Sequence, residues 1–190
     1  MRLQLMIGAL AATASVPAFA QETYVMDPVH SQPGFEATHL GYSSQVGNFT
    51  KSTGKVTLDR AAKKGTVDVT IDATSLRTFD ARLDTAVKGE RFFNVEKFPT
   101  ITFKSSNVKF DGDKVAAVDG ELTMLGVTKP VTLAVSNFSC ADNPFNKKPM
   151  CGGNATGTIK RSDWGMAQGV QTQTPGDVVT LRIPIEAYKE

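Results

Sequence analysis

Two histidines, one serine and one aspartate near the start of the chain could carry acid–base or nucleophilic chemistry. Asp27, His30 and Ser31 lie within five residues, and His39 is the only other histidine. Adjacent residues on a strand point to opposite faces, so His30 and Ser31 are poorly placed as a base and its nucleophile. The GxSxG motif of serine hydrolases is missing from the sequence. The sequence therefore does not favour a catalytic triad, and His30 and His39 are left as candidate acid–base groups or rim residues.

A metal site would need ligands beyond the two histidines. No carboxylate stands at ligand spacing from His30 or His39, so we predict no metal and no obligatory cofactor. The two cysteines, Cys140 and Cys151, bracket a loop-like segment rich in Pro, Asn and Lys, without the CxxC spacing of redox pairs. We predict that they form a disulfide, as exported proteins often do.

The charge balance argues against nucleic acid as a partner. The 190 residues carry 21 basic and 19 acidic side chains, which give a formal net charge of +2. Hydrophobic residues make up 41% of the chain, enough for a substantial core. One domain of this length is expected, with neither a basic nucleic-acid patch nor a strongly charged membrane face.

The first twenty residues predict a secretory signal peptide. Arg2 provides a positive start, Leu5–Val16 is apolar and rich in small residues, and Ala18–Ala20 fits a cleavage site. The apolar run is too short to span a membrane, so no stable membrane anchor is expected. We expect residues 1–20 to be removed and residues 21–190 to form one domain in the periplasm.

An aromatic stretch, residues 91–105, organises the mature chain. It contains Phe92, Phe93, Phe98 and Phe103, four of the eleven phenylalanines. Just before it, Asp80–Gly89 predicts one short helix, with Asp80 as N-cap and Gly89 as the C-terminal stop. A helix of about two turns is marginal alone, so we expect Phe92 and Phe93 to pack it onto the rest.

Apolar residues alternate with polar ones along most of the remaining chain, a pattern typical of half-buried antiparallel strands. The clearest example is Thr66–Ala73. The other predicted extended segments are Tyr24–Pro28, Ser31–Leu40, Gly47–Asp59, Thr100–Phe110, Lys114–Met124, Pro130–Phe138, Asn154–Arg161 and Val178–Tyr188. Long strands in meander order with one helix favour an all-β, up-and-down antiparallel barrel, and eight strands leave room for a small ligand.

The order of motifs resembles the YceI-like family of exported polyisoprenoid-binding proteins. The resemblance covers about Tyr24 to Ala187, and its most specific part combines two blocks. The motifs are Asp27-Pro-Val-His30-Ser31, Phe92-Phe93-Asn94-Val95 with Phe98-Pro99-x-Ile101-x-Phe103-x-Ser105, Leu122-Thr123-x-x-Gly126-Val127-Thr128-Lys129-Pro130-Val131, and Arg161-Ser-Asp163-Trp164-Gly165-Met166.

This resemblance implies a lipocalin-like, eight-stranded barrel whose hydrophobic pore holds an isoprenoid lipid, such as a polyprenyl chain or a quinone tail. It implies a carrier and no enzyme. The predicted pore residues are Phe35, Phe49, Phe92, Phe93, Ile101, Phe103, Leu122 and Trp164, and the predicted head-group residues at the mouth are His30, His39, Arg82 and Arg161. Trp164 and Arg82 replace residues common in the family, and the Cys140–Cys151 insertion is not general to it.

Two other functions stay open at this level. One is an enzyme acting on an apolar substrate with His30 or His39 as the acid–base group. The other is a stress-response or electron-transfer interaction module, which would need an exposed apolar patch on the outer barrel face. The sequence names neither the ligand's chain length nor the pathway, and it leaves open a homodimer and whether Phe92 or Phe93 faces the pore.

Overall fold

The computed structural model describes residues 21–190, so the predicted signal peptide lies outside the described residues. Residues 21–190 form eleven strands, one α-helix and two short 3-10 helices. The strands are β1 (Glu22–Met26), β2 (Gly34–His39), β3 (Ser43–Phe49), β4 (Ser52–Asp59), β5 (Lys64–Asp72), β6 (Leu76–Arg77), β7 (Thr100–Asp111), β8 (Lys114–Met124), β9 (Val127–Asp142), β10 (Pro149–Lys160) and β11 (Val178–Lys189). The helices are η1 (Ala73–Ser75), α1 (Ala81–Lys88) and η2 (Arg161–Trp164).

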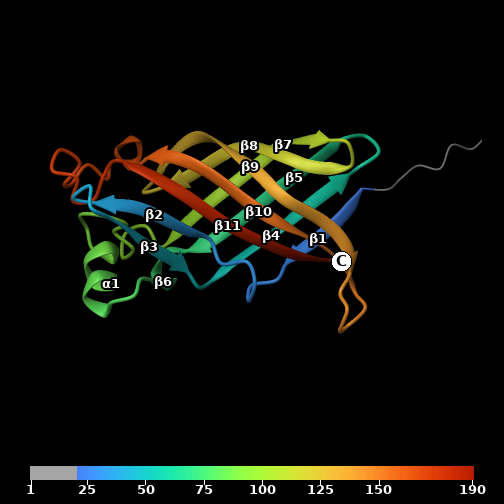
Figure 1. The fold of residues 1–190 in the computed structure, drawn as a ribbon, viewed down its shortest axis with the longest axis horizontal. Helices are drawn as coiled ribbons and strands as arrows, with labels where there is room; N and C mark the ends of the chain where they lie inside the picture. Colours follow the sequence, from blue (N-terminus) through green and yellow to red (C-terminus); the bar gives the residue numbers. More distant parts are fainter. Residues whose placement is uncertain (1–20) are drawn as a thin grey trace, which may run out of the picture.

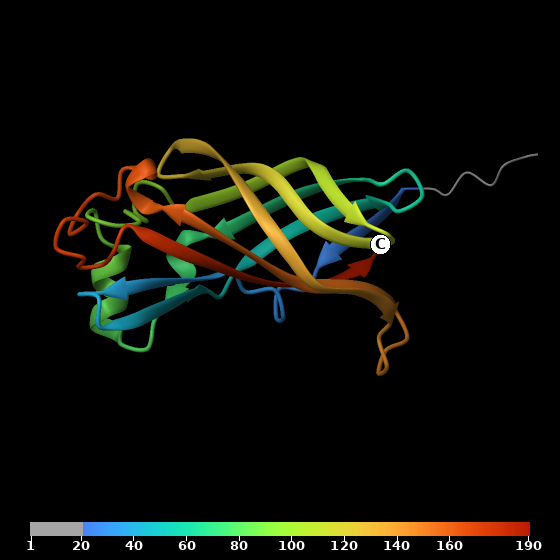
Figure 2. The same ribbon diagram turned by 45° about the horizontal axis from the view of Figure 1, so that its top comes forward.

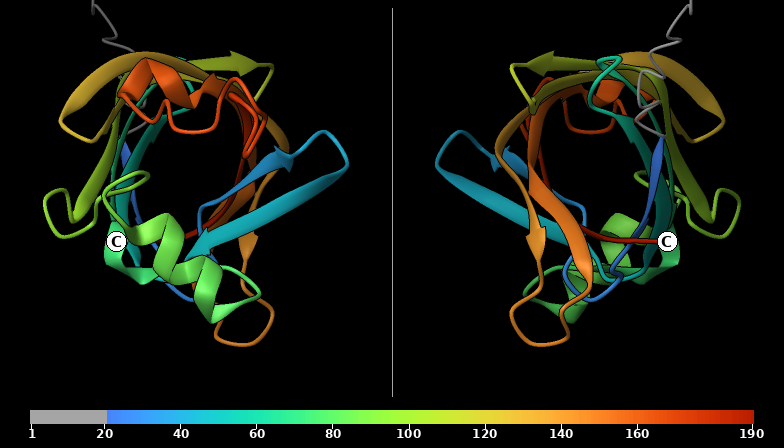
Figure 3. Two further views of the ribbon diagram at one scale, coloured as in Figure 1. Left: turned by 90° about the vertical axis from the view of Figure 1, so that its left-hand side faces the viewer. Right: turned by 90° about the vertical axis from the view of Figure 1, so that its right-hand side faces the viewer.

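Eight of the strands close into an antiparallel barrel, which confirms the predicted fold class. The ring runs β1-β4-β5-β7-β8-β9-β10-β11, and the end of β11 pairs back with β1. Figure 3 looks along this barrel from its two ends. Most neighbouring strands in the ring are also neighbours in the chain, as the hairpin turns in the sequence predicted.

The remaining three strands, β2, β3 and β6, form an arm beside the ring. The first part of β11 pairs with β2, which pairs with β3, and β3 pairs with β6. The arm flares away from the barrel wall at one end (Figure 3). The barrel is therefore closed by β1 at one end and widened by the arm at the other.

The single strand predicted over Gly47–Asp59 is wrong, because the structure breaks it into β3 and β4. Thr50 and Lys51 are two consecutive exposed residues, so the inward-facing phase shifts by one residue at the break. The Lys51 amide donates to Ser75 Oγ at 3.0 Å instead of joining a ladder. The alternation on either side of the break is intact, which is why the sequence did not reveal it.

The two ends of the barrel are made of different segments. The mouth end comprises the β2–β3 turn, α1, the β8–β9 turn and residues 161–177, and the far end comprises the β4–β5, β7–β8 and β9–β10 turns. In Figures 1 and 2 the mouth end lies at the left, and the β9–β10 turn and the C-terminus lie toward the right.

Helix α1 confirms the predicted helix. It lies in the connection between β6 and β7, across the mouth end (Figure 1). Asp80 caps it by accepting a hydrogen bond from the Arg82 amide at 2.8 Å. No residue of α1 is fully buried. Asp84 holds the helix to the preceding strand by accepting hydrogen bonds from the backbone N–H and the hydroxyl of Thr78 at 2.5 and 2.7 Å. Of the helices in residues 21–190, none has both the length and the apolar character needed to cross a bilayer.

The disulfide is present, but its surroundings differ from the prediction. Cys140 and Cys151 are bonded and face each other across β9 and β10. These strands were predicted as Pro130–Phe138 and Asn154–Arg161. Both are longer, because β10 continues to pair with β11 through Gly152 and Gly153 despite its loop-like composition. Only residues 143–148 remain as the turn.

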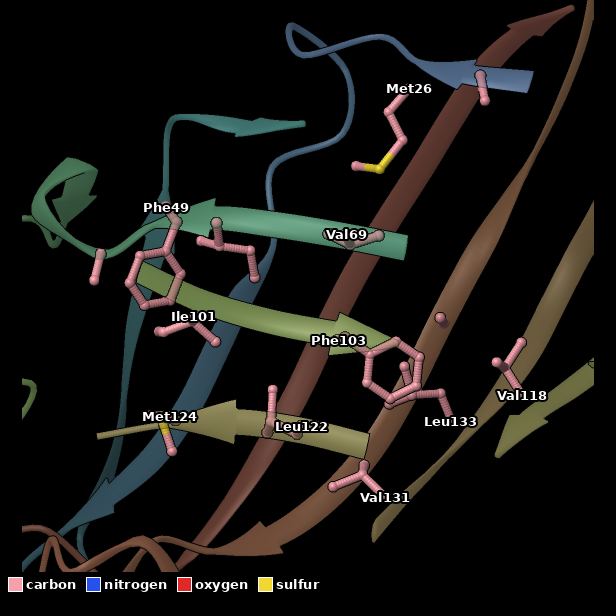
Figure 4. Close-up of a cluster of buried hydrophobic side chains, with 14 of the residues drawn as sticks. Met26, Phe49, Val69, Ile101, Phe103, Val118, Leu122, Met124, Val131 and Leu133 are labelled. Atoms are coloured by element: carbon pink, nitrogen blue, oxygen red, sulfur yellow. The ribbon is translucent and has the colours of Figure 1, made fainter. Parts of the chain in front are cut away.

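The interior is built from alternate residues of the ring strands (Figure 4). The labelled side chains in that view are apolar and come from β1, β5, β7, β8 and β9, with Phe49 joining them from β3. Phe103 lies over Gly120 on the neighbouring strand, where a Cβ would come within 2.5 Å of the ring. Glycine is therefore required opposite this ring.

Candidate functional site

The barrel encloses an apolar cavity of about 370 Å³. That volume falls in the range of sites that hold small ligands, about 300–1,000 Å³. Every strand except β6 contributes to the lining, and α1 contributes its apolar stripe, Leu83, Ala86 and Val87. The cavity thus combines the closed barrel with the helix that lies across its mouth.

Strand β11 shows how far the apolar lining extends. Its inward residues alternate along nearly the whole strand, from Val179 near the mouth end to Ala187 near the far end. Eight residue steps correspond to about 27 Å of strand, or about 20 Å along the axis of a tilted barrel. This length suits an extended chain better than a compact ligand.

The polar groups of the lining gather at the mouth end. The polar or charged side chains there are those of His39, Gln45, Thr78, Arg161 and Thr174. The one polar lining side chain toward the far end is that of Tyr24, on β1. The Tyr24 hydroxyl donates to Glu22 Oε2 at 2.6 Å. Burial, with a smaller contribution from Glu22, raises the pKa of Tyr24 to about 12, so the phenol stays protonated.

Arg161 is the buried charge at the mouth, with 3% of its surface exposed. Its guanidinium donates hydrogen bonds to four backbone carbonyls. They are those of Gly176 (2.9 Å), Met166 (2.5 Å), Gln168 (2.8 Å) and Pro175 (2.5 Å). Burial lowers its pKa and the nearby Asp177 opposes that effect. Arg161 therefore fastens the 162–177 segment to the barrel and leaves one of five N–H groups without a carbonyl partner.

Three rings connect the arm to the segment after α1. The centroids of Phe35 and Phe49 lie 6.1 Å apart, and each lies 5.5 Å from the centroid of Phe93. Phe92 lies under the Arg161 guanidinium, 6.0 Å from its carbon to the ring centroid. Both Phe92 and Phe93 line the cavity, since residues 91–93 form a turn and not a strand.

The structure brings nine of the twelve predicted site residues together in one lining: Phe35, Phe49, Phe92, Phe93, Ile101, Phe103, Leu122, His39 and Arg161. Trp164 is buried outside the cavity lining, with 3% of its surface exposed. Its indole N–H donates to the Leu122 carbonyl at 3.2 Å. The Arg82 side chain is 92% exposed and pairs with Asp80 at 2.8 Å. Neither residue lines the cavity.

His30 also lies outside the cavity lining. Its Nδ1 is 2.7 Å from Asp27 Oδ2 and 3.9 Å from Glu186 Oε2, so a carboxylate distant in sequence joins the motif. Asp27 raises the pKa of His30, and His30 lowers the pKa of Asp27. Ligand atoms of the three residues lie within 4.8 Å of one another, an arrangement that spacing in the sequence could not show.

Ser31 is committed to the backbone of β11. Its hydroxyl donates to the Glu186 carbonyl at 2.9 Å and accepts from the Glu186 amide at 2.9 Å, and the residue is fully buried. His30 directs Nδ1 at Asp27. These hydrogen bonds give Ser31 a structural role.

Most aliphatic residues of the lining were not among the predicted site residues. Val69, Leu133, Leu181, Ile183 and Ile185 line the cavity, although none was singled out as a site residue. Their signal was the same alternation that predicted the strands. That pattern identifies an inward face but does not distinguish a filled core from a lined cavity.

Comparisons with known proteins place the chain among YceI-like proteins. The family model described as the YceI-like domain matches residues 24–187. Protein YceI of Escherichia coli O157:H7 is 40% identical over 140 residues, which cover 72% of this chain and 71% of that protein. The UPF0312 protein Ent638_1570 of Enterobacter sp. (strain 638) is 36% identical over 167 residues, covering 86% and 85%.

Solved structures share the fold. The Campylobacter jejuni YCEI protein aligns with a TM-score of 0.66 and 28% identity, covering 76% of this chain and 84% of that one. Burkholderia cenocepacia BcnA aligns with a TM-score of 0.72 and 24% identity, covering 85% and 99%. A polyisoprenoid binding domain from Saccharophagus degradans aligns with a TM-score of 0.62 and 15% identity, covering 88% and 98%. At these last two identities the likeness concerns the fold alone.

Proposed function

The chain belongs to the YceI-like family, and we propose that it is a carrier that holds an isoprenoid lipid in its barrel. The ligand would be a polyprenyl chain or a quinone tail. The observation that carries this proposal is the cavity itself, apolar from Val179 to Ala187 and polar only near its mouth, apart from Tyr24. The Saccharophagus degradans relative, described as a polyisoprenoid binding domain, supports this ligand class.

Apolar burial alone can supply the affinity. Each buried CH₂ is worth about 0.8 kcal/mol, so a five-carbon isoprene unit yields roughly 3–4 kcal/mol before ordering costs. Three or four units approach the roughly 12 kcal/mol of a nanomolar complex. A lining of Leu, Ile, Val and Phe needs no polar contact to retain such a chain, and it discriminates weakly between chain lengths.

The position of the polar groups supports one orientation of the ligand. A head group would lie at the mouth end near His39, Gln45, Thr78 and Thr174, which line the cavity there. The N–H of Arg161 that no carbonyl accepts could donate to an oxygen of that head group. The tail would then run toward Tyr24, whose hydroxyl is already bonded to Glu22.

We also propose that the protein works in the periplasm, after removal of residues 1–20. The signal-like N-terminus supports export. The Cys140–Cys151 disulfide supports an oxidising compartment.

Native mass spectrometry of protein purified from a bacterial periplasm tests the proposal. We expect a bound species whose mass, after organic extraction, matches a polyprenol, a polyprenyl phosphate or a quinone. Protein that carries no lipid, and whose Tm does not rise when a quinone or a prenol is added, would contradict the carrier function.

A matched pair of variants locates the ligand. Ala155 lines the cavity, whereas its neighbour Thr156 is exposed on the outer face of β10. Ala155→Phe fills the cavity and should abolish lipid retention, while Thr156→Phe should leave it unchanged. Equal retention in both variants would place the lipid outside the barrel.

A further inference from the structure

The rim of the cavity mouth exposes large apolar side chains. Phe79, two residues before α1, is 93% exposed, and Tyr42, in the β2–β3 turn, is 90% exposed. Leu40, two residues before Tyr42, is 47% exposed. Both segments belong to the mouth end (Figures 1 and 3). Side chains of this size are costly to leave in water, and aromatic rings at loop tips are typical of surfaces that contact a bilayer interface.

Three segments of the mouth end carry no Asp, Glu, Lys or Arg at all. They are residues 38–46, 122–128 and 164–176. Every turn of the far end is charged, as in the β4–β5 connection, Asp59-Arg-Ala-Ala-Lys-Lys64. Removing charged groups from water is expensive, so the mouth end can approach a lipid surface at much lower cost than the far end.

Charge near α1 permits contact with a lipid surface and does not require strongly anionic lipid. Residues 77–98 carry five basic and four acidic side chains, a net charge of +1. Asp84 is turned inward onto Thr78, and the exposed Arg82 side chain pairs with Asp80 at 2.8 Å. The charges next to Phe79 therefore largely cancel, and no repulsion from anionic head groups is expected.

The cavity lining reaches the same rim. Leu83, Ala86 and Val87 of α1 line it, as do His39, next to Leu40, and Thr78, next to Phe79. A lipid chain leaving the cavity here would enter water unless the rim rests on another apolar phase. This step depends on the proposed carrier function, and it indicates why apolar side chains surround the mouth.

We propose that the mouth rim, defined as Leu40, Tyr42, Phe79 and the exposed face of α1, docks reversibly on a lipid bilayer. Tyr42 and Phe79 enter the head-group layer, and Arg82 lies at the phosphate level. The barrel axis then points into the membrane, and the cavity exchanges lipid directly with the leaflet.

Flotation with vesicles made of equal parts phosphatidylethanolamine and phosphatidylglycerol tests this proposal. The variant is Tyr42→Ser combined with Phe79→Ser, and neither residue lines the cavity. The matched control is Phe145→Ser, since Phe145 is equally exposed, at 93%, in the β9–β10 turn of the far end. We expect the double variant to partition onto vesicles about ten- to a hundredfold less than the parent, and the control to match the parent.

The outcomes separate docking from lipid carriage. Equal partitioning of parent and double variant, or an equal loss in Phe145→Ser, would overturn the docking surface. A dimer of the parent in sedimentation that the double variant loses, without vesicle binding, would overturn it in favour of a second copy. Binding of a short-chain ubiquinone in solution tests the cavity separately, and all three proteins should retain it. If the parent binds no ubiquinone but still docks on vesicles, the carrier function alone would be contradicted.

Discussion

The mouth end and the far end of the barrel are held together by different means. At the far end, main-chain pairing of β1 with β11 closes the ring, the disulfide joins β9 to β10, and ion pairs such as Lys189–Glu22 (2.7 Å) cover the surface. At the mouth end, side-chain contacts supplement the strand pairing of the arm. Arg161 binds backbone carbonyls, Asp84 binds Thr78, and Phe93 packs between the rings of the arm.

This difference separates stability from access. Main-chain ladders and a disulfide break only when the fold is lost, whereas side-chain contacts at a rim can open locally. The far end should therefore set the stability of the whole barrel. The mouth end should set how fast a ligand enters and leaves.

The largest expected effect is on the far end. Replacing both cysteines, as Cys140→Ser with Cys151→Ser, should lower the free energy of unfolding by about 3 kcal/mol by the loop-entropy argument. For a chain of this size that corresponds to a Tm lower by about 6–12 °C, measured by calorimetry without reductant. Release of bound lipid at low temperature should not change. An unchanged Tm, or a faster release, would break the division between the two ends.

Arg161→Ala should act on the mouth end alone. It removes four hydrogen bonds from a charged donor to the 162–177 segment, and local opening should become easier by about 2–3 kcal/mol. Hydrogen exchange of amides in that segment should accelerate by about 30- to 160-fold, with the far-end amides unaffected. Arg161→Lys should recover only part of the protection, because a lysine lacks the planar fork. Uniform acceleration across the barrel would instead make Arg161 a determinant of global stability.

Phe93→Ala should loosen α1. The substitution removes the contacts of the Phe93 ring with Phe35 and Phe49, and each such aromatic pair contributes about 0.5–1.5 kcal/mol. We expect a modest decrease in Tm and a faster dissociation of bound quinone in a stopped-flow displacement assay. Phe145→Ala, at the exposed far-end turn, serves as the control and should change neither quantity.

The smallest effect concerns the surface pair of Asp27 and His30. The pKa of His30 is raised above its ordinary value of 6.5, so its contribution to stability is present below that pH and is lost as pH rises through the raised value. The pKa of Asp27 is lowered from 3.8, so its contribution is lost as pH falls through the lowered value. Thermal scans should show a slight fall of Tm with rising pH near neutrality that His30→Gln abolishes. The same fall in both proteins would assign it to other groups.

Local patterns in the sequence predicted most of the fold. Alternation in segments such as Thr66–Ala73 predicted antiparallel strands, and Asp80 with Gly89 predicted the helix with its caps. The break at Thr50–Lys51 was missed because both flanking strands keep their alternation. The strand character of Gly152–Gly153 was missed because it comes from pairing with β11, which local composition does not report.

The site was predictable in part for the same reason. Phe35, Ile101 and Phe103 sit on inward faces that alternation identifies, and the structure brings them into one cavity. The role of Arg161 depends on four carbonyls of a folded segment, and the Glu186 carboxylate reaches His30 only through the barrel closure. Such contacts depend on how the folded chain brings residues together, so no local sequence motif predicts them.

A structure of the protein with a bound isoprenoid quinone tests the central claim most directly. We expect the tail inside the barrel, in contact with Leu181, Ile183 and Ile185, and the head group at the mouth end near Arg161. A quinone bound on the outer surface, or with its head group beside Tyr24 at the far end, would contradict it.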